Sequence, residues 1–189
     1  CLVGSEMCIR DSEYLESHRK DLDGIYISGG EPLMHEGVVS FLQYAKTLNY
    51  KIKIHTNGMF YERLKTILAQ KLVDHVSLDI KNAPSAYAKT CGVEDMDLKD
   101  IEKSLDLLKQ SVVPYDICVT LVDELHNQAT IEELGEWIQG VDTVILQPFE
   151  DRETTIDHSL HRPSFKVVLK YKKIFEKYVK HVKIRGDQA

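Results

Sequence analysis

Apolar runs of strand length alternate, from residue 13 onward, with segments in which apolar residues recur at helical spacing. The runs predict strands at residues 24–28, 50–55, 75–80, 115–121, 143–147 and 181–184. The segments between them predict helices at 13–22, 37–48 and 61–70, after Asp97, after Thr130, and from Pro163 to Val179. Strands that alternate with helical crossovers form parallel sheets. The pattern therefore predicts an α/β protein, built either as a doubly wound sheet or as a complete or partial β/α barrel.

Local signals mark where three of these helices begin. Asp97 is the predicted N-cap of the fourth helix. Thr130 and Glu133 have the spacing of a capping box, and Pro163 has the properties of a first helical residue. Residues 151–162 are polar and have no period, so they are predicted to form an irregular loop. Nothing from residue 13 to residue 189 indicates a second domain.

The composition fits one globular domain. The 189 residues are 43% hydrophobic and 29% charged, which is typical of a soluble protein with a full core. A net charge of −6 argues against a nucleic-acid partner, and no apolar run approaches the ~20 residues that span a bilayer, so no membrane contact is expected. No secretory signal is visible and no cysteines form a C-x-x-C pair, so neither zinc nor disulfides are predicted. The cytoplasm is the expected location.

Residues 1–12 do not read as part of the fold. The segment has no useful period, and the codons of a sequencing-library transposon adapter give Leu2 through Asp11 in order. We interpret it as an adapter artefact that replaces the genuine N-terminus, and we exclude Cys1 and Cys8 from the candidate ligands. A native transcript that encodes these residues would contradict this interpretation.

The stretch Gly29-Gly30-Glu31-Pro32 follows the first predicted strand directly. Two glycines allow a tight turn and a close approach of backbone to a ligand, and Pro32 restricts the direction in which the chain leaves. Glu31 is thereby placed at the carboxyl end of a parallel strand, where α/β proteins bind their ligands. The alternative is an ordinary turn between a strand and a helix.

Further polar side chains follow the later strands. They are His55, Thr56, Asn57 and Gly58 after the second, Asp79 and Lys81 at the third, and Gln147 and Phe149 at the fifth. Glu31 can accept an ammonium, Lys81 can pair with a carboxylate, and Phe149 can cover a purine. The set suits an amino acid joined to a nucleoside. The pair Asn57-Gly58 is also a common turn.

The chain resembles the radical S-adenosylmethionine (SAM) superfamily, whose Gly-Gly-Glu-Pro motif follows the second barrel strand. In order and spacing, the segments resemble the activating proteins of anaerobic ribonucleoside-triphosphate reductase. The segments are 22–32, 55–58, 77–81, Tyr87–Gly92 and 145–149. The resemblance covers residues 13 to 186.

This resemblance implies a partial β/α barrel that lacks its first strand and its cluster loop, and a protein that binds SAM and a [4Fe-4S] cluster. Its activity would be that of an oxidoreductase: one electron cleaves SAM, and a hydrogen atom is removed from a glycine of a partner enzyme. The partners would be that glycyl-radical enzyme, anaerobic ribonucleotide reductase, and a low-potential electron donor. The implied SAM-binding residues are Gly29, Gly30, Glu31, His55, Thr56, Asn57, Asp79, Lys81, Gln147 and Phe149, with a possible monovalent cation at Thr56 and Asp79.

Two departures from the family accompany this resemblance. Relatives often carry an acid at the position of His55. The resemblance therefore does not settle the cation site or a contact with the ribose. The family's C-x-x-x-C-x-x-C cluster loop precedes residue 13 and is absent, since Cys1 and Cys8 have the wrong spacing and Cys91 and Cys118 belong to later elements. We therefore expect no catalytic residue, no cluster and no activity in this chain, and an unpaired edge on the first strand.

Three alternatives remain open from the sequence. The chain could descend from a 7-carboxy-7-deazaguanine synthase-like enzyme or from a pyruvate formate-lyase activase-like enzyme. It could also be a non-catalytic scaffold that binds SAM. The segments Tyr87–Gly92 and 145–149 favour the reductase activase.

Overall fold

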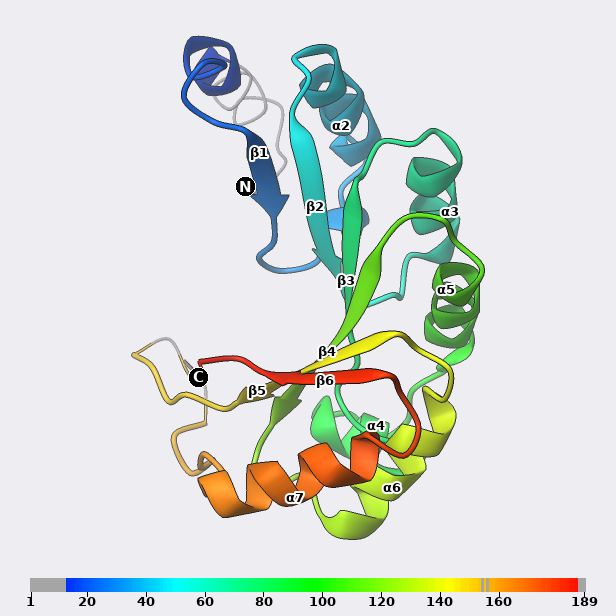
Figure 1. The fold of residues 1–189 in the computed structure, drawn as a ribbon, viewed down its shortest axis with the longest axis vertical. Coiled ribbons are helices and arrows are strands. Elements are labelled where there is room, and N and C mark those ends of the chain that lie inside the picture. Colours follow the sequence, from blue (N-terminus) through cyan, green and yellow to red (C-terminus); the bar gives the residue numbers. More distant parts are fainter. Residues whose placement is uncertain (1–12, 154, 156, 187–189) are drawn as a thin grey trace. The chain divides into compact units, whose positions relative to one another are not determined.

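The computed structural model describes residues 13–153, 155 and 157–186 (Figure 1). Residues 1–12, which include the predicted adapter segment and both N-terminal cysteines, lie outside the described residues. The strands are β1 (Gly24–Ile27), β2 (Lys51–Thr56), β3 (His75–Asp79), β4 (Tyr115–Leu121), β5 (Thr143–Pro148) and β6 (His181–Ile184). They are hydrogen-bonded in the order β1-β2-β3-β4-β5-β6 in an open parallel sheet. The order never reverses, as it does in a doubly wound sheet, so the partial β/α barrel is confirmed.

Most helices fall in the predicted intervals, but the first ends at residue 17 rather than 22, the last ends at Phe175 rather than Val179, and the short helix Pro32–Met34 was not predicted. The helices are residues 13–17, η1 (Pro32–Met34), α2 (Val38–Thr47), α3 (Tyr61–Ala69), α4 (Pro84–Thr90), α5 (Lys99–Lys109), α6 (Gln128–Trp137) and α7 (Phe165–Phe175). The capping box predicted at Thr130 is wrong: Asn127 caps α6, and Thr130 is its third residue. Pro163 does not begin α7, because Ser164 is its N-cap. Helix α4 was not predicted. No helix in the described part of the chain is long and apolar enough to cross a membrane.

The chain divides into two compact units. The first comprises Cys1–Leu78 and Lys99–Tyr115, and the second comprises Asp79–Leu98 and Asp116–Ala189. In the first unit, α2, α3 and α5 lie along one face of β2 and β3 (Figure 1). Ile52, Ile54 and Leu64 are fully buried or nearly so, so this layer holds the core of the unit.

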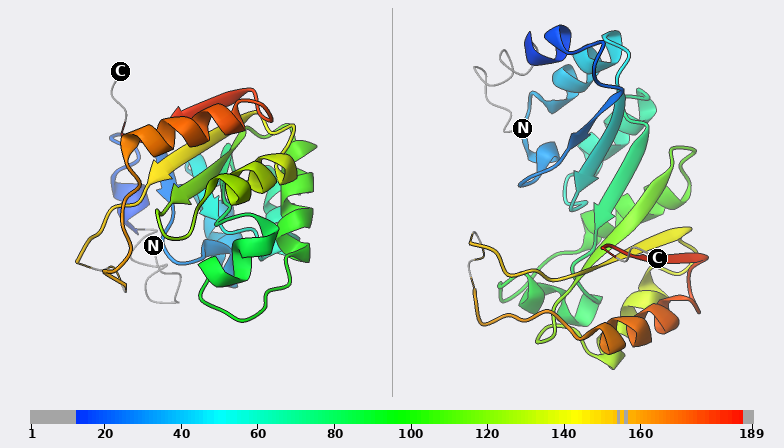
Figure 2. Two further views of the ribbon diagram at one scale, coloured as in Figure 1. Left: turned by 90° about the horizontal axis from the view of Figure 1, so that it is seen from below. Right: turned by 60° about the vertical axis from the view of Figure 1, so that its left-hand side comes forward.

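The second unit contains α4, α6, α7, β5 and β6. Helix α6 packs against both α4 and α7, and α7 contacts β5 and β6 (Figure 2). Val144, Leu146 and Phe175 have no exposed surface in this core. Tyr87 of α4 meets Trp137 of α6 edge to face, with ring centroids 6.0 Å apart.

Side chains alternate between apolar and polar along the strands of each unit. In β2, Ile52 and Ile54 are buried, whereas Lys51, Lys53 and His55 alternate with them and are more exposed. Successive side chains of a strand point to opposite faces, so one face is apolar and the other is polar. Parallel sheets are usually apolar on both faces. The polar face is therefore the one suited to bind a ligand.

Candidate functional site

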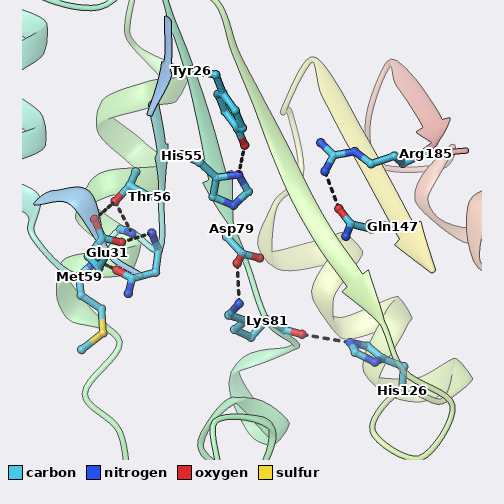
Figure 3. A network of polar contacts seen from close by, with 12 residues as sticks. Tyr26, Glu31, His55, Thr56, Met59, Asp79, Lys81, His126, Gln147 and Arg185 are labelled. Carbon is cyan, nitrogen blue, oxygen red and sulfur yellow. Dashed lines mark hydrogen bonds and ion pairs between the residues drawn. The ribbon is translucent and has the colours of Figure 1, made fainter. Parts of the chain in front are cut away.

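The Glu31 carboxylate is the centre of a hydrogen-bond network in the first unit (Figure 3). Its Oε1 accepts hydrogen bonds from the Leu33 N–H at 3.0 Å and from the Thr56 hydroxyl at 2.8 Å. Its Oε2 accepts one from the Asn57 N–H at 2.6 Å. Glu31 is only 8% exposed, so these charge-assisted bonds replace water around the carboxylate. A carboxylate has about four lone-pair positions, so one remains for a ligand.

The backbone before Glu31 forms an open turn. Gly29 and Gly30 have φ angles of +91° and +53°, in the left-handed region that favours glycine. A Cβ built on either residue meets nothing within 4 Å. The turn is left-handed and unobstructed, as a close approach to a ligand requires. Glu31 and Pro32 then begin η1, with the Glu31 side chain as its cap.

The turn after β2 holds Thr56 and Asn57 in place. The Thr56 hydroxyl accepts a hydrogen bond from the Gly58 N–H at 3.2 Å, and the Asn57 Oδ1 accepts one from the Met59 N–H at 3.0 Å. Gly58 has φ +79°, and a Cβ there would lie 2.8 Å from the Leu78 Cδ1. The positive φ favours glycine here, and a Cβ would also press on the buried Leu78 side chain.

His55 does not join the Glu31 network. Its Nδ1 lies 2.8 Å from the Tyr26 hydroxyl of the neighbouring strand. Tyr26 is paired with Lys53 in the register of β1 and β2, and its side chain is 54% exposed. Tyr26 is a site residue that the sequence did not indicate, because its apolar neighbours identified it only as part of a strand.

The candidate residues of the second unit form two separate groups. Asp79 Oδ2 lies 2.5 Å from Lys81 Nζ, and the two side chains are 15% and 41% exposed. The ammonium has three donors and uses one here, so donors remain for a ligand carboxylate. The backbone oxygen of Lys81 lies 3.0 Å from the Nε2 of His126.

Gln147 and Phe149 lie at the end of β5. Gln147 Oε1 accepts a hydrogen bond from Arg185 Nη1 at 2.5 Å. Phe149 lines a cavity of about 500 Å³ together with Leu160, the acidic Glu150 and Asp151, and four Arg and His side chains. These are Arg152, His158, His161 and Arg162. Arg185 is a second site residue that the sequence did not indicate.

The two cysteines in the described part of the chain are poor ligands. Burial raises the pKa of the Cys118 thiol to about 11, and burial also raises the pKa of Cys91. Within residues 13–153, 155 and 157–186, no three His, Cys, Asp or Glu side chains gather into a metal site. The described residues therefore do not fit an iron–sulfur cluster.

The fold is that of a β/α protein with polar side chains at the ends of its strands. The chain belongs to the radical SAM superfamily, which it matches over residues 5–138. It is 30% identical over 169 residues to a protein of Methanocaldococcus jannaschii that is assigned as a glycyl-radical enzyme activating enzyme. That match covers 86% of this chain and 70% of the relative.

Two solved structures share the fold. One is a domain of pyruvate-formate lyase-activating enzyme from Bacteroides vulgatus, with a TM-score of 0.67 and 19% identity, covering 86% of this chain and 99% of that one. The other is Streptococcus suis SuiB bound to S-adenosylmethionine, with a TM-score of 0.73 and 13% identity, covering 96% of this chain and 44% of that one. At these identities the likeness shows the fold alone.

Membership of the superfamily implies SAM and a [4Fe-4S] cluster as cofactors. The residues of the first unit fit the amino-acid end of SAM, because Glu31 keeps a free lone-pair position beside an open glycine turn. The cluster has no matching ligand set among the described residues.

Proposed function

We propose that this chain is the SAM-binding core of an activating enzyme for a glycyl-radical enzyme, and that its partner is anaerobic ribonucleoside-triphosphate reductase. The enzyme is an oxidoreductase that acts in the cytoplasm with a low-potential electron donor. The observation that carries the proposal is the Glu31 network, a buried carboxylate with one position left for an ammonium. The relative assigned as a glycyl-radical enzyme activating enzyme supports the activase class.

The chain's own residues hold SAM by complementary charges. Glu31 accepts the methionine ammonium beside the turn of Gly29 and Gly30. Lys81 donates to the methionine carboxylate, and Asp79 keeps the ammonium of Lys81 in place. Asn57 and Thr56 fix the Glu31 carboxylate, so it needs no reorientation when the ligand binds.

The other candidate residues have supporting roles in the proposal. Gln147 and Phe149 lie beside the adenosine, where an aromatic face can stack on the base. His55 is held by Tyr26 and stays beside the ribose. The Thr56 hydroxyl donates to Glu31 and accepts from Gly58, so it keeps one lone pair for a monovalent cation. In an enzyme that also held the cluster, SAM would supply the one-electron chemistry that removes hydrogen from carbon.

We further propose that the 189 residues bind SAM but do not ligate the cluster. The sequence contains no three cysteines at the 3-and-2 spacing, and the described residues offer no substitute set. Anaerobic reconstitution with iron and sulfide should leave the chain without a [4Fe-4S] absorption or Mössbauer spectrum. A stable cluster spectrum, together with SAM cleavage, would contradict this part of the proposal.

The activity test uses residues 13–189 preceded by an added segment that carries three cysteines at C-x-x-x-C-x-x-C spacing. The protein is incubated anaerobically with SAM, a reductant and either anaerobic ribonucleotide reductase or pyruvate formate-lyase. A glycyl-radical EPR doublet on the reductase is expected, and the matched Glu31→Gln variant should give none. A radical on the lyase alone identifies the other activase, and a radical on neither contradicts the proposed function.

A further inference from the structure

His126 is a buried histidine of the second unit. It lies between β4 and α6, immediately before Asn127, the N-cap of α6. Only 4% of its surface is exposed. The Tyr171 hydroxyl of α7 donates to its backbone oxygen at 2.9 Å. Helix α7 thus holds the backbone of His126, whereas the imidazole has other partners.

The hydrogen bonds of the ring determine which nitrogen carries the hydrogen. Nε2 lies 3.0 Å from the backbone oxygen of Lys81, which can only accept, so Nε2 must donate. In the neutral ring Nδ1 is then an acceptor, and the Val122 N–H points at it from 3.1 Å. Burial lowers the pKa of His126, which favours this neutral form. Both ring nitrogens are satisfied in one tautomer only.

The bond to Lys81 belongs to a set that holds the chain after β3. The Ile80 N–H donates to the Cys118 oxygen at 3.0 Å, and the Asn82 side chain donates to the Leu125 oxygen at 2.8 Å. His126 holds Lys81, which lies between Ile80 and Asn82 (Figure 3). The Lys81 side chain is 41% exposed, and the ion pair with Asp79 is the contact that the structure gives its ammonium. The direction of this ammonium therefore depends on Asp79 and on the backbone from which the side chain extends.

We infer that His126 is a positioning residue for ligand binding: its Nε2–H fixes the Lys81 backbone and so holds the Lys81 ammonium where it meets the carboxylate of SAM. The inference rests on the proposed function for the role of Lys81. His126 itself does not touch the ligand. Its partners are all backbone groups of Lys81 and Val122.

Two amide replacements separate this role from a purely structural one. In His126→Gln the side-chain NH₂ reaches the position of Nε2 and can still donate to Lys81. In His126→Asn the side-chain oxygen reaches the position of Nδ1 and still accepts from Val122, but nothing reaches Lys81. Both variants should lose similar stability. Tyr171→Phe is a further control, because it removes the bond to the His126 backbone and keeps the ring in place.

The test is calorimetric titration of SAM into the 189-residue chain. His126→Asn should weaken SAM binding about tenfold, as the loss of one hydrogen bond allows. His126→Gln and Tyr171→Phe should stay within about threefold of the wild type. Equal losses in His126→Gln and His126→Asn, or wild-type affinity in His126→Asn, would overturn the inference.

A wild-type chain that does not bind SAM would contradict the proposed function. In that case a second measurement tests the role of His126. Hydrogen exchange then follows the amides of residues 80–83 in the unliganded variants. Faster exchange in His126→Asn, with exchange near wild type in His126→Gln, supports the positioning of the Lys81 backbone. Unchanged exchange in His126→Asn refutes it.

Discussion

Replacing Glu31 by glutamine removes the charge of the central carboxylate and keeps its shape. Glutamine has one side-chain oxygen, so it can keep the two bonds that Oε1 accepts, while its NH₂ group faces the Asn57 N–H. One bond to a charged group is lost, at about 1.5–3 kcal/mol, and two lose their charge assistance. The lower desolvation cost of an amide offsets part of this, which leaves a net loss of about 2–3 kcal/mol.

The assay is hydrogen exchange of the Asn57 amide, followed by mass spectrometry. A loss of 2–3 kcal/mol in local stability corresponds to roughly 30- to 140-fold faster exchange, since about 1.4 kcal/mol is a factor of ten. The control is Glu36→Gln, because Glu36 is exposed, and it should leave exchange unchanged. Asn57 exchange within threefold of the wild type in Glu31→Gln would refute the reasoning.

Three further predictions concern stability. Gly58→Ala should lower the free energy of unfolding by about 2–5 kcal/mol, because the added Cβ overlaps Leu78 and the left-handed backbone is strained. The control is Gly140→Ala, which has φ +86° and open space around the Cβ, so it should cost only the backbone strain of about 1–2 kcal/mol. Equal losses of the two variants in thermal unfolding would contradict this prediction. Asn127→Ala should cost about 1 kcal/mol in denaturant unfolding through the lost capping box, and no loss would exclude that role. Acidification should destabilise the wild type more than His126→Gln, because burial lowers the pKa of His126 in the folded state. The contribution of His126 to stability is therefore complete above the unfolded-state pKa of about 6.5. Below that pH the contribution falls by at most about 1.4 kcal/mol per pH unit. Parallel pH profiles of the two proteins would contradict the last prediction.

The strand pattern of this chain could be predicted because each strand is a short apolar run bounded by turn residues. Tyr115–Leu121 and His181–Ile184 were predicted to the residue. Helix α4 was missed because it is only seven residues long, begins with a proline and has a single buried side chain, Tyr87. The capping box was misplaced because Thr130 and Glu133 satisfy the same spacing rule as Asn127 and Thr130.

The candidate site was predictable where its contacts are local in sequence. Lys81 and Asp79 are two residues apart, and their ion pair follows from that spacing. Tyr26 and His55 are 29 residues apart, and the register of β1 and β2 brings them together. His126 had no signal in the sequence, since the groups that it binds are backbone atoms that every residue carries.

The central claim is that the turn of Gly29, Gly30 and Glu31 holds the ammonium of SAM. Calorimetric titration of SAM, and of its analogue without the amino group, into the wild-type chain and Glu31→Gln tests it most directly. The wild type is expected to bind the analogue at least about tenfold more weakly than SAM, and Glu31→Gln is expected to bind both with similarly low affinity. Equal affinity of the wild type for the two ligands, or an undiminished preference for SAM in Glu31→Gln, would contradict it.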